Sequence, residues 1–156
     1  MASSSKPFLR AFRLCSPRWR AAALSGEGAQ KYGGRWNSPG QAMVYLGSTR
    51  ALTALELLVH LPTPSSRRKP FVLIEVELPI TELALEKVSG NWNAQPPEKD
   101  SFEVGDKWLK SGHSLALAVP SCLIPEETCI LLNPLHPENE KVRVVSERSF
   151  SFDQRL

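Results

Sequence analysis

A helical pattern between Arg50 and Leu61 carries a single acidic side chain among apolar ones. At about 100° per residue, apolar side chains cover most of the helix circumference, which is typical of a buried helix. The polar exceptions, Thr53, Glu56 and His60, fall on one narrow stripe. Burying a carboxylate in apolar surroundings is costly unless it is paired or hydrogen-bonded. The stripe is therefore either the solvent-facing side of a half-exposed helix or one wall of a cleft.

A glycine-rich segment from Gly33 to Gly40 is the second place where the residue types suggest chemistry. Gly33 and Gly34 allow the backbone to approach a ligand, and Arg35 has a guanidinium fork suited to a phosphate group. The same residues also fit an ordinary tight turn with a solvated arginine. Tyr45 follows in an expected buried strand, where a core tyrosine with a partnered hydroxyl is the usual explanation.

Spacing argues against several other kinds of site. The segment Gly26 to Lys31 lacks the third glycine of a GxGxxG fingerprint, and neither a GxxxxGK[ST] motif nor a GxSxG elbow occurs. The histidines and cysteines do not fall at zinc-ligand spacing, so we expect no metal site. The net charge is +3 without a concentrated basic stripe, which argues against a nucleic-acid interface despite four tryptophans.

Strands and helices must position these side chains. The residue types predict strands at Pro7–Leu14, Ala42–Leu46, Phe71–Leu78, Ser114–Val119, Thr128–Leu132 and Lys141–Ser146. Apolar and basic residues alternate in the first of these segments, and the last is followed by a further alternating segment at Ser149–Phe152. Helices are predicted at Arg50–Leu61, with Ser48 or Thr49 as the N-cap, and at Phe102–Lys110; Pro62–Pro70 is predicted to be a polar loop. Few segments are long enough for helical crossovers, so we predict an α+β domain with largely antiparallel sheets and a few helices.

Length and composition indicate one ordinary globular domain. The chain has 156 residues, of which 42% are hydrophobic and 22% charged, and no apolar run approaches the roughly 20 residues of a membrane span. Three cysteines cannot all pair and no secretory leader is evident, so we expect reduced thiols and a cytoplasmic protein. We expect residues 1–6 to be a flexible tail and residues 7–156 to form the domain.

Three motifs, taken together, resemble a known family. The string GEGAQKYGGRWNSPGQAMVYLGS, residues 26–48, is similar to the opening of a RES domain. It continues into ALTALELLVHL, residues 51–61, which resembles the glutamate-bearing helix of that family. VPSCLIPEETCILLNPLHP, residues 119–137, resembles its serine motif and closing Asn-Pro-x-His-Pro. The family takes its name from an arginine, a glutamate and a serine, here Arg35, Glu56 and Ser121.

The resemblance implies a toxin that cleaves the nicotinamide–ribose bond of NAD on a fold like that of ADP-ribosyltransferases. It implies that Arg35 binds the pyrophosphate, with Gly34 permitting close approach, and that Tyr45 packs against the nicotinamide ring. Glu56 would stabilise the oxocarbenium-like charge as nicotinamide leaves, and Ser121 would orient Glu56 or a phosphate. Arg13 matches an early basic position of the family and is expected as a second anion contact.

Asn133 and His136 are expected to be mainly structural. NAD is expected as the substrate, with no cofactor and no metal.

Three hypotheses about activity remain open. The first is NAD cleavage by hydrolysis or phosphorolysis, and the second is transfer of ADP-ribose to a protein by the same site. The third is an inactive binding module, against which the intact set Arg35, Tyr45, Glu56 and Ser121 argues. The resemblance further implies neutralisation by a helix-turn-helix, Xre-type antitoxin and contact with DNA only through that antitoxin. We also expect no membrane association, since no apolar run is long enough, and consider a homodimer.

Overall fold

Six strands form one sheet in the order β4-β5-β2-β1-β3-β6, and every pairing between named strands is antiparallel. The computed structural model describes residues 8–81, 83 and 85–156, so the expected tail at residues 1–6 lies outside the described residues. The strands are β1 (Leu9–Cys15), β2 (Val44–Gly47), β3 (Phe71–Leu78), β4 (Ala116–Pro120), β5 (Thr128–Leu132) and β6 (Arg143–Phe150). The predicted α+β class with antiparallel pairing is confirmed, as a single sheet rather than several.

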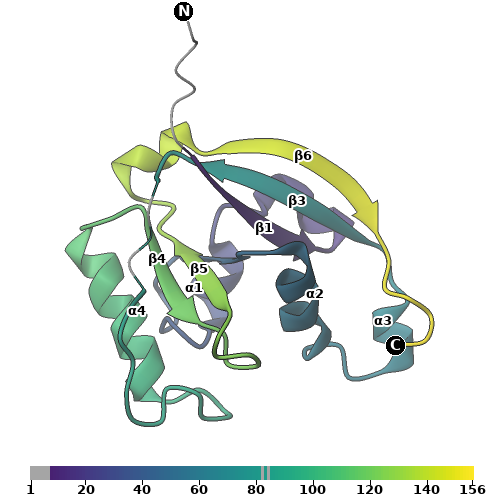
Figure 1. Cartoon of the computed structure of the whole chain (residues 1–156), viewed down its shortest axis with the longest axis horizontal. Helices are drawn as coiled ribbons and strands as arrows, with labels where there is room; N and C mark the ends of the chain where they lie inside the picture. Colours follow the sequence, from purple (N-terminus) through teal and green to yellow (C-terminus); the bar gives the residue numbers. More distant parts are fainter. Residues whose placement is uncertain (1–7, 82, 84) are drawn as a thin grey trace, which may run out of the picture.

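Helices lie around this sheet as short, separate elements (Figure 1). They are α1 (Glu27–Tyr32), α2 (Arg50–Leu58), α3 (Pro64–Arg67) and α4 (Lys99–Ser111), with 3₁₀ segments η1 (Pro17–Ala22) and η2 (Pro137–Lys141). The helix predicted at 102–110 is three residues longer at its start and one at its end. Helix α1 and both 3₁₀ segments have no counterpart among the predicted elements, because such short segments carry little periodicity.

The segment Pro62–Pro70 was predicted to be a loop, and this is wrong over Pro64–Arg67, which form α3. Thr63 caps the helix: its hydroxyl accepts from the Ser66 backbone N–H at 3.1 Å, and the Ser66 hydroxyl accepts from the Thr63 backbone N–H at 3.2 Å. Pro64 stands in the first turn, where a missing N–H costs nothing. This reciprocal capping is enough to form one helical turn in a polar basic segment.

The two faces of the sheet carry different apolar clusters. On one face Leu14, Phe71 and Leu73 pack against Ala54 and Leu57 of α2. On the other face a larger cluster is covered by the chain that follows η1; its buried members are Ala11, Cys15, Ala23, Val44, Leu46, Ile74, Val76, Leu78, Leu115, Ala116, Ile130 and Leu132. Helix α2 therefore belongs to one face only, and the candidate site is built on that face.

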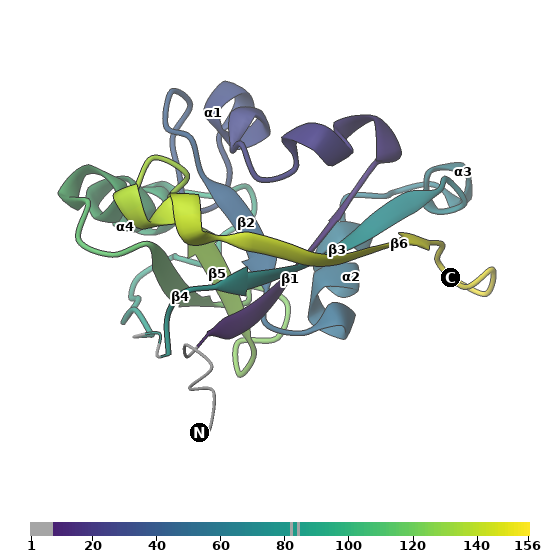
Figure 2. The same cartoon turned by 90° about the horizontal axis from the view of Figure 1, so that it is seen from above.

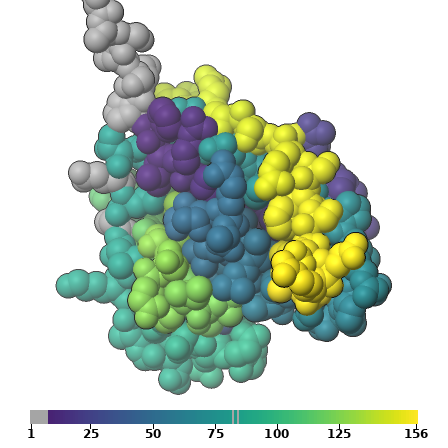
Figure 3. Space-filling view, turned by 45° about the vertical axis from the view of Figure 1, so that its right-hand side comes forward, coloured from purple at the N-terminus to yellow at the C-terminus, as the bar shows by residue number. Residues whose placement is uncertain are grey.

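Helix α2 begins where predicted, with Thr49 as the N-cap accepting from the Leu52 backbone N–H. It ends at Leu58, three residues before the predicted end, and a turn leads into Pro62. Although its apolar pattern is typical of a buried helix, only Leu52 and Thr53 are buried, so the helix is half-exposed. Figure 3 shows α2 in blue at the molecular surface, between the green hairpin region and the yellow C-terminal end.

Strand β6 lies beside β3 at the outer edge of the sheet, as Figure 2 shows from above. Seven of its eight residues are exposed, and it joins the two separately predicted alternating segments into one strand. At the opposite edge, Leu85 makes an isolated parallel bridge with Ala118 of β4. Among the described residues, no helix is long and apolar enough to cross a membrane.

Candidate active site

Glu56 lies on α2 with one carboxylate oxygen held by two donors. The Ser121 hydroxyl donates to its Oε1 atom at 2.6 Å, and the Cys129 thiol donates to the same atom at 3.5 Å. No described residue hydrogen-bonds to the second oxygen, Oε2. We call Glu56, Ser121 and Cys129 the Glu56 cluster. Its geometry leaves one oxygen of a half-buried carboxylate available to a ligand.

Ser121 is fully buried directly after β4, at the start of the hairpin that leads to β5. Its hydroxyl oxygen accepts from the backbone N–H groups of Leu123 and Ile124, each at 3.1 Å. A hydroxyl has one proton and two lone pairs, so both lone pairs are engaged and the proton is directed at Glu56. The hairpin turn thus makes Ser121 an obligate donor to the carboxylate.

A close approach between α2 and β2 places Glu56 over this hairpin. A Cβ atom on Gly47 would overlap the Thr53 hydroxyl, so glycine is required for the helix to pack at this distance. The Thr53 hydroxyl donates to the Thr49 carbonyl at 2.7 Å within the helix, and Phe12 of β1 offers a second carbonyl at 3.4 Å. The polar stripe therefore faces the protein at Thr53 and Glu56, and only His60, beyond the helix end, is exposed.

Cys129 is a member of this cluster that the sequence analysis missed. Its position in β5 places it beside Gly47 of β2 and Val119 of β4 in the sheet register. Burial, followed by the charge of Glu56, raises the pKa of the Cys129 thiol far above its usual value. Residues 128–132 are almost uniformly apolar, so the sequence indicated neither which face Cys129 occupies nor that Glu56 covers that face.

A second group of residues, the turn cluster of Gly34, Asn37 and Tyr45, is internally hydrogen-bonded. The Tyr45 hydroxyl donates to Asn37 Oδ1 at 2.6 Å and accepts from the Trp36 backbone N–H at 3.0 Å. A Cβ atom on Gly34 would lie 2.5 Å from the Tyr45 hydroxyl oxygen, so this glycine is required for the close approach. Burial raises the pKa of Tyr45 well above its ordinary value. Tyr45 is thus a half-buried tyrosine with a partnered hydroxyl.

Asn37, which the sequence analysis did not single out, is the centre of the turn cluster and is only 1% exposed. Its amide nitrogen donates to the carbonyl groups of Ala29, Ser38 and Gln41 at 2.9, 3.1 and 3.0 Å. These bonds join α1 to the glycine-rich segment. The available signal was an asparagine within the predicted turn, because Asn side chains in turns commonly hydrogen-bond to the backbone.

Arg35 is half-buried and binds the segment 92–95. Its Nη1 atom donates to the carbonyl oxygens of Trp92 at 3.0 Å and Ala94 at 2.8 Å, and its Nη2 atom donates to Gln95 Oε1 at 3.0 Å. A guanidinium has five N–H groups, so Nε–H and one N–H of Nη2 remain. The tight turn is therefore present, but the arginine in it is engaged by protein rather than freely solvated.

Arg13 lies where β1 and β2 pair only through Phe12 and Gly47. Its Nη1 atom donates to the Tyr45 carbonyl oxygen at 3.0 Å, which joins the two strands beside that single pair. Its Nε atom is buried and has no hydrogen-bond partner among the described residues. Burial lowers the pKa of Arg13, since the charged form loses solvation.

The structure brings some of the predicted residues together and keeps others apart. Glu56 meets Ser121, Tyr45 meets Gly34, and Arg13 meets the Tyr45 carbonyl. Arg35 makes no hydrogen bond to the Glu56 cluster. The two are connected through segment 92–95, which Arg35 binds. The Cys122 thiol, next to Ser121, donates to the Asn93 carbonyl of this segment at 3.6 Å. The segment 92–95 therefore lies between the two groups of predicted residues.

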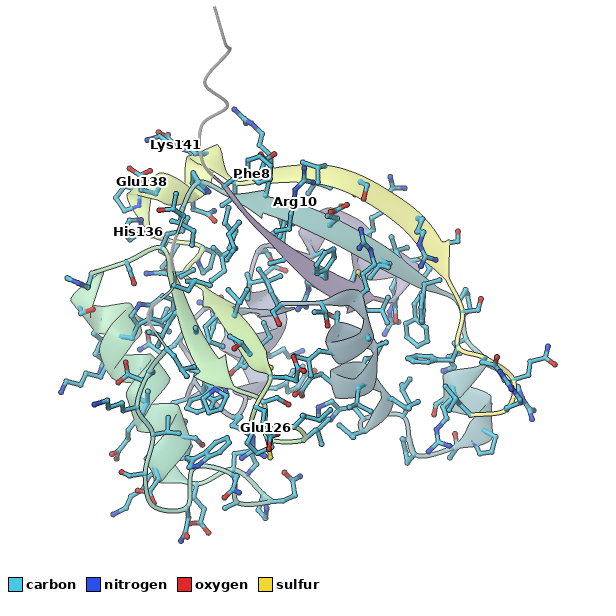
Figure 4. All side chains as sticks on the ribbon, viewed as in Figure 1. Phe8, Arg10, Glu126, His136, Glu138 and Lys141 are labelled. Carbon is cyan, nitrogen blue, oxygen red and sulfur yellow. The ribbon has the colours of Figure 1, made fainter. Side chains whose placement is uncertain are left out.

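The side chains of the closing Asn-Pro-x-His motif make no hydrogen bond to either cluster. Figure 4 labels His136, Glu138 and Lys141 at the end of the molecule opposite Glu126, which lies in the β4–β5 hairpin. The Asn133 side-chain oxygen accepts from the Leu135 backbone N–H at 3.0 Å, and His136 Nδ1 accepts from the Glu138 backbone N–H at 3.1 Å. Both side chains stabilise the turn into η2, which agrees with the structural role predicted for them.

Two hollows in the described part of the chain lie away from the predicted site residues. One hollow of 540 Å³ lies between η1 and the sheet and is lined by Arg18, Leu24 and Val144 among others. A second, of 220 Å³, adjoins Gln41 and His136. Neither hollow is lined by Arg35, Tyr45, Glu56 or Ser121. Within residues 8–81, 83 and 85–156, no group of three or more His, Cys, Asp or Glu side chains is arranged to hold a metal ion.

Comparisons with known proteins agree with the motifs. The profile of the RES domain matches residues 10–153. "Toxin Res" of Yersinia enterocolitica is 38% identical over 149 residues, covering 93% of this chain and 97% of its own length. "Prs ADP-ribosylating toxin" of a Sphingobium species is 39% identical over 144 residues, covering 88% of this chain and 89% of its own.

A crystal structure of the M. tuberculosis MbcT–MbcA toxin–antitoxin complex shares the fold. The TM-score is 0.66 at 16% identity, and the match covers 94% of this chain and 86% of the other. Together with the relatives and the domain match, which spans nearly the whole described chain, the comparisons establish that this protein belongs to the RES-domain family of toxins.

Proposed function

We propose that this RES-domain toxin breaks the bond between nicotinamide and ribose in NAD and so depletes NAD. The observation that carries the proposal is the Glu56 carboxylate, whose Oε1 atom is held by Ser121 and Cys129 while Oε2 has no partner among the described residues. Departure of nicotinamide leaves positive charge on the ribose, and a fixed carboxylate oxygen stabilises such charge. Glu56 is the proposed catalytic residue.

The other predicted residues are assigned to binding NAD. Arg35 would contact the pyrophosphate with the N–H groups that segment 92–95 does not use, and Gly34 would let the phosphates approach the backbone. The Tyr45 ring would contact nicotinamide, while its hydroxyl remains in the turn cluster. Arg13 is the second proposed anion contact, through guanidinium N–H groups that the Tyr45 carbonyl does not use.

Two classes of acceptor for the released ADP-ribosyl group are compatible with this site. Water or phosphate would make the protein an NAD glycohydrolase or phosphorylase, which is our first proposal. A protein acceptor would make it an ADP-ribosyltransferase, and the relative named "Prs ADP-ribosylating toxin" favours that second proposal. The cluster of a partnered serine and an available carboxylate argues against an inactive binding module.

The direct test is release of nicotinamide from NAD by the purified full-length chain, with Glu56→Gln as the inactive control. Parallel reactions contain no phosphate, phosphate, or candidate acceptor proteins, and the products separate hydrolysis, phosphorolysis and ADP-ribose transfer. A reaction after exhaustive chelation is expected to proceed at the same rate, because we propose no metal and no cofactor. Wild-type protein that leaves NAD intact in every reaction would overturn the proposal.

We further propose an antitoxin partner of the helix-turn-helix, Xre type, which would carry any contact with DNA, and a cytoplasmic location, where NAD is available. The shared fold with the toxin of a toxin–antitoxin complex supports an antitoxin partner, without indicating its type. Co-expression with the adjacent reading frame is expected to yield a stable complex in which NAD cleavage is suppressed. Light scattering on the free toxin would test for the homodimer. A co-purified complex with full activity would contradict suppression by blocking of the site.

A further inference from the structure

Glu56 Oε1 receives two hydrogen bonds that come from different parts of the sheet. Ser121 reaches it from the hairpin after β4, and Cys129 reaches it from within β5. A glutamate side chain has three torsions, so one donor alone leaves the carboxylate free to rotate about that contact. Two donors that converge on one oxygen restrict the carboxylate plane and thereby the direction in which Oε2 points.

We infer that Cys129 is a positioning residue, whose thiol fixes the Glu56 carboxylate so that Oε2 is presented to the substrate. The inference rests on the proposed function of Glu56 and adds a residue that neither the motifs nor the comparisons assign. Cys129 is not placed in contact with NAD. It acts only through Glu56.

The backbone around Cys129 makes it suitable for this role. Cys129 is opposite Gly47 of β2 on one side and Val119 of β4 on the other, so its strand is paired along both edges. Val119 is fully buried, and Cys129 packs against the cluster that contains it. The thiol is therefore carried by a rigid element, whereas Ser121 is carried by the hairpin turn. Two supports from separate parts of the sheet hold the carboxylate more firmly than the turn alone.

The protonation state of Cys129 agrees with a donor role. Burial and the nearby charge of Glu56 both disfavour the thiolate and raise the pKa of the thiol. Cys129 therefore keeps its proton at neutral pH and donates a hydrogen bond to the carboxylate. The same conditions make it a poor nucleophile, since the thiolate is the reactive form.

The kinetic test compares Cys129→Ala, which removes the donor, with Cys129→Ser, which keeps one. We expect Cys129→Ala to lower kcat for NAD cleavage by about 3- to 10-fold with KM within about twofold, since a weak donor to a carboxylate is lost. Cys129→Ser is expected to restore kcat to within about twofold of wild type. If the alanine variant fails to fold, Cys129→Val replaces it, because valine fills the space without a donor.

Cys15→Ala is the matched control, because Cys15 is a buried thiol in the cluster on the other face of the sheet. It is expected to cleave NAD at the wild-type rate. Wild-type kcat in Cys129→Ala would overturn the inference, and so would an equal loss in Cys129→Ser and Cys129→Ala, which would indicate packing rather than donation.

A second measurement tests the contact without NAD turnover. Iodoacetamide labelling of Cys129 at pH 9, followed by mass spectrometry, is compared between wild type and Glu56→Gln. Removing the charge is expected to lower the pKa of the thiol and to accelerate labelling of Cys129 at least about threefold, with Cys15 unchanged. An unchanged rate for Cys129 would overturn the inference. If labelling responds while wild type never releases nicotinamide, the proposed function fails and the contact between Cys129 and Glu56 stands.

Discussion

The Glu56 cluster and the turn cluster are both built from side-chain hydrogen bonds, but they differ in what they leave unpaired. In the turn cluster the Tyr45 hydroxyl and both polar atoms of the Asn37 side chain have partners within the protein. In the Glu56 cluster, Ser121 is saturated, while Oε2 of Glu56 has no hydrogen bond from any residue that the structure describes.

This difference distinguishes the Glu56 carboxylate, which has an oxygen free to act on a ligand, from side chains whose hydrogen bonds only hold the local structure. A polar cluster with every partner supplied is rigid and specifies one local structure, whereas an incomplete one can bind something else. Arg35 and Arg13 are intermediate, because each is partly engaged and each retains free N–H groups. Substitutions in the two clusters should therefore have different consequences for activity and for stability.

The largest effect is expected from Glu56→Gln. Glutamine keeps an oxygen that can accept from Ser121 and Cys129, but it lacks the negative charge that the proposed transition state requires. We expect NAD cleavage to fall by about 100- to 1,000-fold, with the melting temperature close to that of wild type. Nicotinamide release measured by chromatography, together with a thermal melt, checks this. A well-folded variant with wild-type turnover would remove the Glu56 cluster from the mechanism.

Arg35→Lys is expected to lower kcat/KM for NAD by about 10- to 100-fold. Lysine keeps the charge but lacks the planar guanidinium. It therefore cannot bind a phosphate while it also donates to the carbonyl groups of Trp92 and Ala94. The matched control is Arg148→Lys, since Arg148 is exposed on the edge strand β6 and should tolerate the change. Steady-state kinetics on both variants checks the expectation, and equal kinetics for all three proteins would reject a role for Arg35 in binding.

Ser121→Ala sharpens the comparison, because it should affect both activity and stability. We expect about a 10-fold loss of kcat as Glu56 loses its shorter hydrogen bond. The backbone N–H groups of Leu123 and Ile124 also lose their acceptor, which should cost about 1–3 kcal/mol of unfolding free energy. Urea denaturation and kinetics measure the two effects separately. A loss of stability with unchanged kcat would make Ser121 a purely structural residue of the hairpin.

Gly34→Ala tests the turn cluster by sterics alone. The added Cβ would lie 2.5 Å from the Tyr45 hydroxyl oxygen, and the turn must shift to avoid this contact. We expect a cost of about 1–3 kcal/mol in urea denaturation. Gly28→Ala is the matched control in the same region, because no atom lies within 4 Å of its added Cβ and alanine favours a helix. Equal stability of the two variants would contradict the close packing of Gly34 against Tyr45.

The smallest effect on activity is expected from Tyr45→Phe, which keeps the ring proposed to contact nicotinamide. NAD cleavage should stay within about threefold of wild type, while the loss of two hydrogen bonds should cost about 1–2 kcal/mol of stability. The raised pKa of Tyr45 means that its stabilisation is complete below pH 10, the ordinary tyrosine value, and is lost as the pH rises above it. Urea denaturation between pH 8 and pH 11 should therefore show a steeper alkaline loss for wild type than for Tyr45→Phe.

Local signals were sufficient for several elements. Strands β3 and β5 have the predicted limits, and α2 begins at the predicted residue, because the residue types of a strand and an N-cap are properties of neighbouring residues. The antiparallel class also followed from the lengths of the connections. Helix α3 could not be predicted in this way, since it depends on reciprocal capping by Thr63 and Ser66 rather than on apolar spacing.

The sequence by itself determined the residue types of the site and, through three ordered motifs, the family. Only the tertiary structure decided which groups touch. Ser121 is 65 residues and Cys129 is 73 residues from Glu56 in the chain, and they meet it because the sheet order places β5 beside β2, against which α2 packs. Arg35 is likewise engaged by a segment 57 to 60 residues away. Contacts over such separations depend on strand order and close helix packing, which no local pattern of residues encodes.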